Sequence, residues 1–136
     1  MKQNLRWAAP LALALALALA AAWPLAGQAM DKGEQNGIAY VTGGVGQDES
    51  AAIRGMKDYS LRVLAAAKSG EYVADVRVAI RDSGGKDVLS VTTQGPYLLA
   101  RLAPGDYRID AEYGSARQSR QVRVPASGRA EVSFYF

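Results

Sequence analysis

Short segments in which apolar and polar residues alternate, each ended by glycine or proline, constrain the fold of this chain most strongly. The clearest segment has Tyr107, Ile109, Ala111 and Tyr113 alternating with charged residues. Successive side chains of a strand point to opposite faces, so a period of two predicts a strand with one face on a core. The preceding residues 103–106 read Ala-Pro-Gly-Asp, and a Pro-Gly pair fits the two corners of a tight turn.

The same pattern recurs along most of the chain and predicts a mainly β protein. Alternating or apolar segments that we expect to be strands occupy residues 38–42, 61–67, 76–81, 88–93, 97–102, 107–113, 118–124 and 130–136. About seven short strands, with a turn signal roughly every 8 to 12 residues, are typical of an antiparallel β-sandwich. We therefore predict an antiparallel sandwich of about seven strands over residues 59–136.

Residues 30–58 differ from the rest and are predicted to hold the one helix of the domain. Polar residues 30–37 indicate a flexible lead-in, and a Gly-rich loop follows at residues 43–46. Over residues 48–59, Ala52, Ile53 and Met56 share one face of a helix, while acidic residues lie in the first turn. Acidic residues at that end favour a helix because they complement its dipole.

Residues 1–29 indicate a signal peptide that precedes the domain. Lys2 and Arg6 flank a polar start, a Leu-Ala-rich run follows, and Pro24 comes just before a small-x-small pattern. These are the parts of a secretory signal, which forms a helix during export and is then removed. An uncleaved anchor is the alternative, because the apolar run reaches about 20 residues. Either alternative places the remainder outside the cytoplasm, in the periplasm or secreted.

Composition excludes several chemistries. The chain has no His and no Cys, so Ser-His-Asp and Cys-His catalysis and His- or Cys-based zinc sites are impossible. Without Lys2 and Arg6 the net charge falls from +3 to +1, with 14 basic against 13 acidic residues. That small excess gives little reason to expect nucleic-acid binding. No cofactor, metal or catalytic residue is predicted.

A resemblance to a known family covers residues 95–109 well and residues 59–136 loosely. Leu102, Pro104, Gly105, Tyr107 and Ile109 resemble the Leu-x-Pro-Gly-x-Tyr-x-Val pattern of carboxypeptidase regulatory-like domains. The resemblance implies a transthyretin-like (prealbumin-like) sandwich and an accessory role beside an enzyme or receptor. One transthyretin-like branch hydrolyses 5-hydroxyisourate with histidines, which this chain does not have.

Three features have both a functional and a structural interpretation, and we favour the structural one for each. The Gly-rich loop before the helix suggests a phosphate loop, but the spacing fits no such motif and the acidic residues after it would repel phosphate. Asp82 and Asp87 flank a Gly-rich turn and offer too few oxygens for calcium. Outward arginines suggest a basic face for an anionic glycan, although acidic neighbours dilute its field. These arginines are Arg77, Arg81, Arg108, Arg117, Arg120 and Arg123.

The function we expect is that of an exported, non-enzymatic binding or accessory module contacting another envelope protein or an envelope glycan. A structural subunit of a surface assembly is the first alternative, and a small exported hydrolase is the second. Residues 40–59 have no evident role in a minimal sandwich, which makes them the first place to look for a surface. The candidate interaction residues are Tyr40, Gly43, Gly44, Gly46, Asp48, Glu49, Arg77, Arg108 and Arg123.

Overall fold

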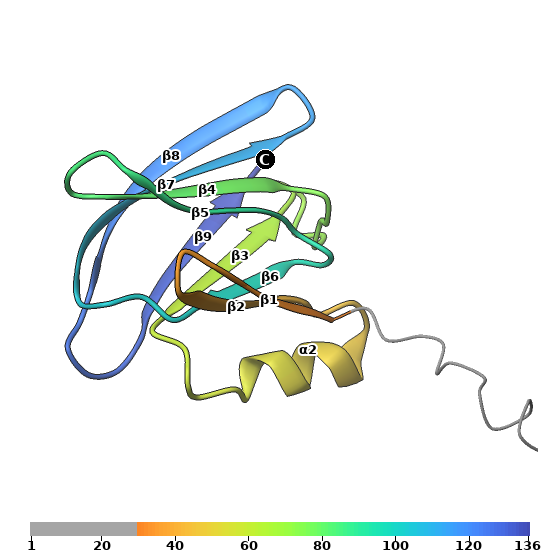
Figure 1. Cartoon of the computed structure of the whole chain (residues 1–136). Helices are drawn as coiled ribbons and strands as arrows, with labels where there is room; N and C mark the ends of the chain where they lie inside the picture. Colours follow the sequence, from red (N-terminus) through yellow and green to blue (C-terminus); the bar gives the residue numbers. More distant parts are fainter. Residues whose placement is uncertain (1–29) are drawn as a thin grey trace, which may run out of the picture.

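Residues 30–136 fold into two β-sheets with one short helix on the outside (Figure 1). The computed structural model describes residues 30–136, and the expected signal peptide at residues 1–29 lies outside the described residues. Within them, sheet A has the strand order β1-β2-β6-β3-β9 and sheet B the order β5-β4-β7-β8. The expectation of a mainly β protein with one short helix is therefore confirmed.

The strand boundaries agree with the alternating segments to within a few residues. Sheet A consists of β1 (Asp31–Gln35), β2 (Ile38–Gly43), β3 (Leu61–Ala66), β6 (Tyr97–Ala100) and β9 (Ala130–Tyr135). Sheet B consists of β4 (Arg77–Asp82), β5 (Asp87–Thr92), β7 (Gly105–Tyr113) and β8 (Ala116–Val124). Residues 59–136 hold seven of these strands, β3 to β9, as predicted, and β1 and β2 bring the described part to nine.

The main core lies between the two sheets and follows from the period of two. Ile109 and Ala111 of β7 are fully buried there, as are Ile80 of β4 and Phe134 of β9. Their sequence neighbours point to the outer faces and carry most of the charge. Tyr107 lies half-buried at the rim of this core, where its hydroxyl donates a hydrogen bond of 2.8 Å to the carbonyl of Ala103.

One pair of strands in sheet A is parallel. Strand β9 runs alongside β3 in the same direction, with Leu61 opposite Ala130 and Ala66 opposite Tyr135. The prediction of a wholly antiparallel sandwich is wrong at this pair. A period of two specifies which face of a strand is buried but not which neighbour it meets or in which direction, and parallel partners need a long crossover.

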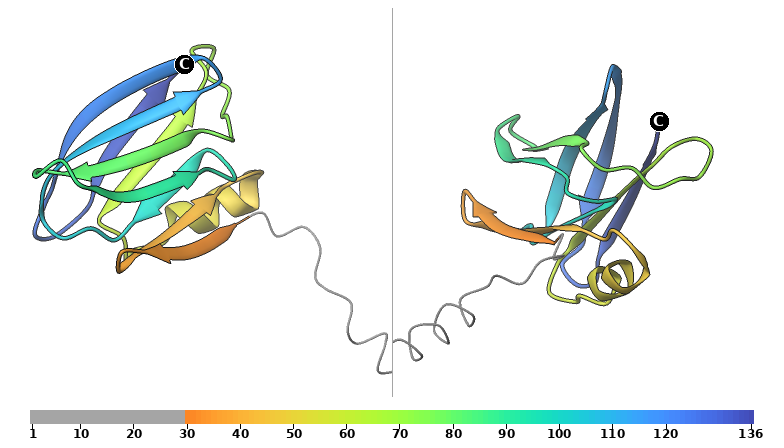
Figure 2. Two further views of the ribbon diagram at one scale, coloured as in Figure 1. Left: turned by 45° about the horizontal axis from the view of Figure 1, so that its top comes forward. Right: turned by 90° about the vertical axis from the view of Figure 1, so that its right-hand side faces the viewer.

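The helix α2 (Gln47–Arg54) covers the outer face of sheet A, as the two views of Figure 2 show. Its Ile53 is fully buried against Val41 of β2 and against Tyr97 and Leu99 of β6. These side chains form a second, smaller core. The helix is shorter than the predicted residues 48–59 because it ends at Gly55, a residue that costs a helix about 1 kcal/mol relative to Ala.

Strand β1 is the element that sequence reasoning missed. Residues 30–37 were expected to form a flexible lead-in, but Asp31–Gln35 pairs with β2 through a turn at Asn36-Gly37, both with positive φ (52° and 77°). An Asn-Gly pair with two positive φ values is the strongest short hairpin signal. The strand is polar because its face is largely exposed, so its composition resembles that of a loop.

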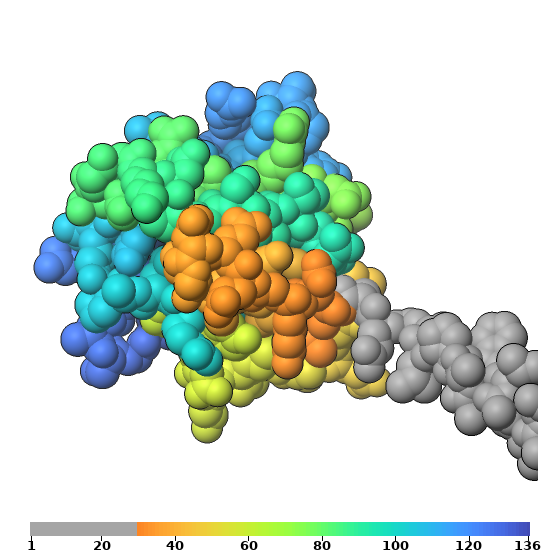
Figure 3. All heavy atoms as spheres, in the orientation of Figure 1, coloured from red at the N-terminus to blue at the C-terminus, as the bar shows by residue number. Residues whose placement is uncertain are grey.

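The β1–β2 hairpin also protects the edge strand of the other sheet. The Gln35 side chain donates to the carbonyl of Ser90 and accepts from its amide, while Asn36 donates to the carbonyl of Val88. In Figure 3 the orange atoms of this hairpin lie against the green atoms of β5. Side chains thus satisfy part of the edge of β5, which would otherwise be open to pairing.

Gly95 provides a test of how closely the loops beside β2 and β6 pack. A Cβ on Gly95 would collide with the backbone of Gly43, whereas a Cβ on Gly84 would make only an ordinary contact with Asp82. We expect Gly95→Ala to lower the free energy of unfolding by about 1–3 kcal/mol because overpacking forces the backbone to shift. Urea denaturation of both variants measures this. Equal stability of Gly95→Ala and Gly84→Ala would contradict the packing described here.

Candidate functional site

The Gly-rich loop between β2 and α2 already holds a carboxylate of its own chain. The backbone amides of Gly44 and Val45 donate to Oε1 of Glu49, at 3.0 and 3.2 Å. Successive amides that converge on one point form an anion-binding concavity. Because Glu49 occupies that point, the geometry supports a structural turn rather than a phosphate loop. Ser50 completes the loop by donating from Oγ to the carbonyl of Gly44.

Glycines are required in this loop because other groups approach it closely. Gly44 has φ +99°, and a Cβ there would lie 2.6 Å from the ring of Tyr97. A Cβ on Gly43 would likewise lie 2.7 Å from the Met30 side chain. The loop therefore lies directly on the second core, and packing explains Gly43 and Gly44, whereas Gly46 has open space and a positive φ of +83°.

Removal of the Glu49 carboxylate tests its role in the loop. We expect Glu49→Ala to lower the free energy of unfolding by roughly 1–3 kcal/mol, because two amides lose a charged acceptor. The matched control is Asp48→Ala in the same helical turn, with an expected loss of about 0.3–1 kcal/mol from the helix dipole alone. Thermal or urea unfolding compares them. Equal losses would show that Glu49 acts only through the dipole.

A groove opens beside this loop, between α2 and the segment that leads into β4. It encloses about 920 Å³. Val45, Ala51 and Pro96 contribute apolar surface to it, and Tyr72 and Val73 form the facing wall. Val45 and Tyr72 are 54% and 53% exposed, so one aliphatic and one aromatic side chain are open to a ligand here. Asp48 and Arg54 add one charge of each sign to the lining.

Tyr72 is held in place by Tyr97, which lies in the second core. The two rings meet edge to face with centroids 6.0 Å apart, a preferred geometry for aromatic pairs. The side-chain hydrogen bond to Tyr97 raises the pKa of the Tyr72 hydroxyl, and the charge interaction between the two phenols acts in the same direction. Tyr72 thus presents a fixed, protonated phenol ring to the groove at neutral pH.

The groove collects only some of the residues that the sequence singled out. Gly44, Gly46 and Asp48 line it, whereas Gly43 and Glu49 support the loop beneath. Tyr40 does not line the groove, because its ring packs over Gly33 on β1 and against the main core. A large ring often covers a glycine on a neighbouring strand in this way.

The groove residues that sequence reasoning missed come from outside residues 40–59. Tyr72, Val73 and Ala74 precede β4, and Pro96 precedes β6. Tyr72 follows the turn at residues 68–70, where a large aromatic residue outside any alternating segment was the only available signal. Its position opposite α2 across the groove depends on the tertiary fold.

The outward arginines lie elsewhere, on the outer face of sheet B. Arg77 pairs with Glu112 at 3.2 Å, Arg108 with Asp110 at 3.2 Å and Arg123 with Asp106 at 3.3 Å. All three guanidinium side chains are more than half exposed, so each pair contributes little to stability. Since α2 covers sheet A, the structure does not bring these arginines together with the Gly-rich loop.

Arg120 is an exception among the arginines expected to face outward. It lies on the inner side of β8, with its guanidinium carbon 5.6 Å from the ring centre of Phe134. Phe134 is fully buried. Arg120 therefore covers the open end of the main core with its aliphatic stem and a cation–π contact.

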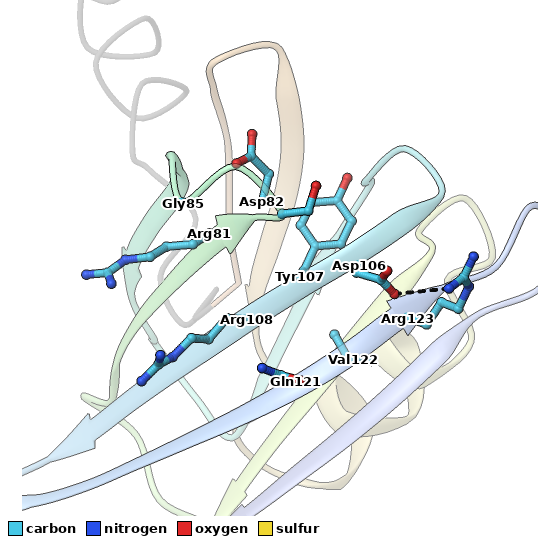
Figure 4. Close-up of a pocket in the computed structure, with 10 residues that line it drawn as sticks. Arg81, Asp82, Gly85, Asp106, Tyr107, Arg108, Gln121, Val122 and Arg123 are labelled. Carbon is cyan, nitrogen blue, oxygen red and sulfur yellow. Dashed lines mark hydrogen bonds and ion pairs between the residues drawn. The ribbon is translucent and has the colours of Figure 1, made fainter.

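A hollow of about 540 Å³ lies where β7 and β8 meet the turn that follows β4 (Figure 4). Arg81, Arg108 and Arg123 lie around it, and a dashed line marks the contact between Arg123 and Asp106. Burial raises the pKa of the Tyr107 hydroxyl, and the Asp82 carboxylate acts in the same direction.

The Gly-rich turn after β4 is not arranged as a cation site. Oδ1 of Asp82 accepts from the amides of Gly84 and Lys86, both at 3.0 Å. Asp87 pairs with Arg81 at 2.8 Å. Residues 30–136 contain no group of three or more acidic residues suited to a metal ion, and no helix among them is long and apolar enough to cross a membrane.

Asp110, on the outer face of sheet B, makes a contribution to stability that depends on pH. A hydrogen bond from Ser119 lowers the pKa of the Asp110 carboxyl, and the hydrogen bond and charge of Arg108 add to this effect. A carboxyl with a lowered folded-state pKa stabilises the protein above its unfolded value, about 4, and this contribution is lost as pH falls through the folded value. We expect wild type to exceed Asp110→Asn in stability at neutral pH and to lose that advantage below the folded pKa. Urea unfolding across pH measures this, and a constant difference would contradict it.

Comparison with known proteins adds no identification to this geometry. No model of a known protein family matches the chain, and no curated protein matches it either.

Proposed function

We propose that this chain is an exported, non-enzymatic binding or accessory module of the bacterial cell envelope, contacting another envelope protein or an envelope glycan. The groove beside α2 is the observation that carries this proposal. It combines exposed Val45 and Tyr72 with a few polar groups, which is the composition of binding sites. Tyr72 in its wall packs edge to face on the buried Tyr97.

Export is supported by residues 1–29, whose basic start, apolar run and small residues are typical of a signal peptide. In this proposal the mature domain begins at Met30 and works in the periplasm or after secretion. Met30 packs against the second core and Gly43, so the domain begins directly at folded structure.

The finer fold we propose is a transthyretin-like sandwich of the carboxypeptidase regulatory-like type. Two sheets around one core are compatible with it. The Pro104-Gly105 turn leads into β7, where Ile109 is buried and Tyr107 lies at the core rim. Domains of that type accompany other proteins, which agrees with a binding role.

Site-specific photocrosslinking in intact cells tests whether the groove is the binding surface. A photoreactive phenylalanine analogue is placed at position 72 of the full chain, or at position 45, and the envelope fraction is analysed after irradiation. We expect a discrete crosslinked protein or glycan species from these positions, since a ligand in the groove would touch both side chains. Val45→Asp combined with the analogue at position 72 should reduce that species, because a buried unpaired charge disfavours binding.

The matched control places the analogue at Lys86, an exposed position in the turn between β4 and β5. The same species from position 86 would indicate non-specific proximity. No species from positions 45 and 72, together with no sedimentation of the protein with purified peptidoglycan, would refute the proposed binding role of the groove.

A further inference from the structure

The two edge strands of sheet B, β5 and β8, differ in how far other groups cover their free backbone. The β5 edge is partly covered by side-chain hydrogen bonds. Gln35 accepts from the amide of Ser90 and donates to its carbonyl, and Asn36 donates to the carbonyl of Val88. At the other edge, β8 has ladder partners only on β7 among the described strands. Gln118 of β8 donates a side-chain hydrogen bond to the carbonyl of Tyr135 in sheet A.

The register shows which backbone groups of β8 are directed away from the sheet. A two-residue hairpin, with Gly114 at φ 59°, places Tyr113 opposite Ala116. That closing pair is hydrogen-bonded, and bonded and non-bonded pairs alternate along an antiparallel ladder. In every non-bonded pair, the backbone amide and carbonyl of the β8 residue point away from β7. The backbone amides and carbonyls directed outward belong to Arg117, Ser119, Gln121 and Arg123. These four residues are exposed.

The side chains of this edge carry positive charge without a compensating acid in the strand. Its nine residues include Arg117, Arg120 and Arg123 and no Asp or Glu. Arg117 and Arg123 are 71% and 79% exposed, and their acidic partners Glu112 and Asp106 lie on β7. Because exposed ion pairs are weak, a carboxylate from another molecule can replace these partners at little cost.

A second copy of this chain meets the edge unfavourably in the register centred on Arg120. If two β8 strands paired antiparallel about Arg120, Arg117 of each copy would lie opposite Arg123 of the other. Like charges directly opposite each other destabilise a strand pair. The same positions favour a strand with acidic residues, whose carboxylates would lie opposite these arginines.

We infer that the free edge of β8 binds an acidic, extended segment of a partner protein by strand addition. The outward amides and carbonyls of β8 would supply the ladder, and its arginines would select the charge. Recognition of this kind takes affinity from the main chain and specificity from the side chains. This surface is separate from the groove beside α2, so either can fail its test without the other.

The test uses the full chain and synthetic peptides of about eight residues with alternating Val and Glu, a length matched to one strand. Peptides with Lys in place of Glu, or with proline at alternate positions, are the controls. We expect binding of the acidic peptide alone. It should weaken with salt, and hydrogen exchange should slow at the amides of residues 117, 119, 121 and 123.

Two variants separate strand addition from general attraction to positive charge. Arg77 and Arg117 flank the same carboxylate of Glu112 with nearly equal exposure, 72% and 71%, but only Arg117 is on the edge strand. We expect Arg117→Glu to weaken binding by about tenfold or more, as for a charge at the contact, and Arg77→Glu to have a much smaller effect. Ser119→Pro removes one outward amide and should also abolish binding.

Several results would overturn the inference. Equal weakening by Arg77→Glu and Arg117→Glu would indicate attraction to the whole face. Binding without slowed exchange at the four edge amides would exclude strand addition, and this readout on the wild-type chain holds even if Ser119→Pro fails to fold. Absence of peptide binding, or a stable dimer that protects the same amides in the free protein, would also refute it.

Discussion

Burial of β6 on both faces is the constraint on which the rest of this structure depends. Leu98 and Ala100 face the main core, and Tyr97 and Leu99 face the second core beneath α2. All four side chains are at most 4% exposed. Strands β2 and β3 pair with β6 on its two sides, so a strand of only four residues joins both cores within one sheet.

The outer side of β6 also explains the geometry of the groove. Tyr97 is large, and the chain opposite it must approach closely, which requires glycine at position 44. That tight loop directs its amides toward Glu49 and fixes the start of α2. The same ring supports Tyr72 on its other side. An exposed aromatic residue is therefore held in place by a buried one.

Local pattern predicted the strands well because each buried face recurs with a period of two, as in Val78 and Ile80 of β4. It did not identify β1, whose exposed residues look like a loop, although Asn36-Gly37 carried the turn signal. Tyr72 became part of the candidate site through contacts distant in sequence, which no local pattern encodes. Tyr40 was singled out with the same segment, but β2 directs it toward the main core and away from the groove.

The parallel pairing of β3 and β9 has a consequence for when the domain can fold. Sheet A brings together a strand near the middle of the chain and the last strand in chain order, and every strand of sheet B is synthesised between them. The nascent chain therefore cannot complete sheet A until β9 has left the ribosome. Long-range pairing of this kind slows folding. Under the export proposed above, such an order of strands would leave the chain more time to cross the membrane before it folds.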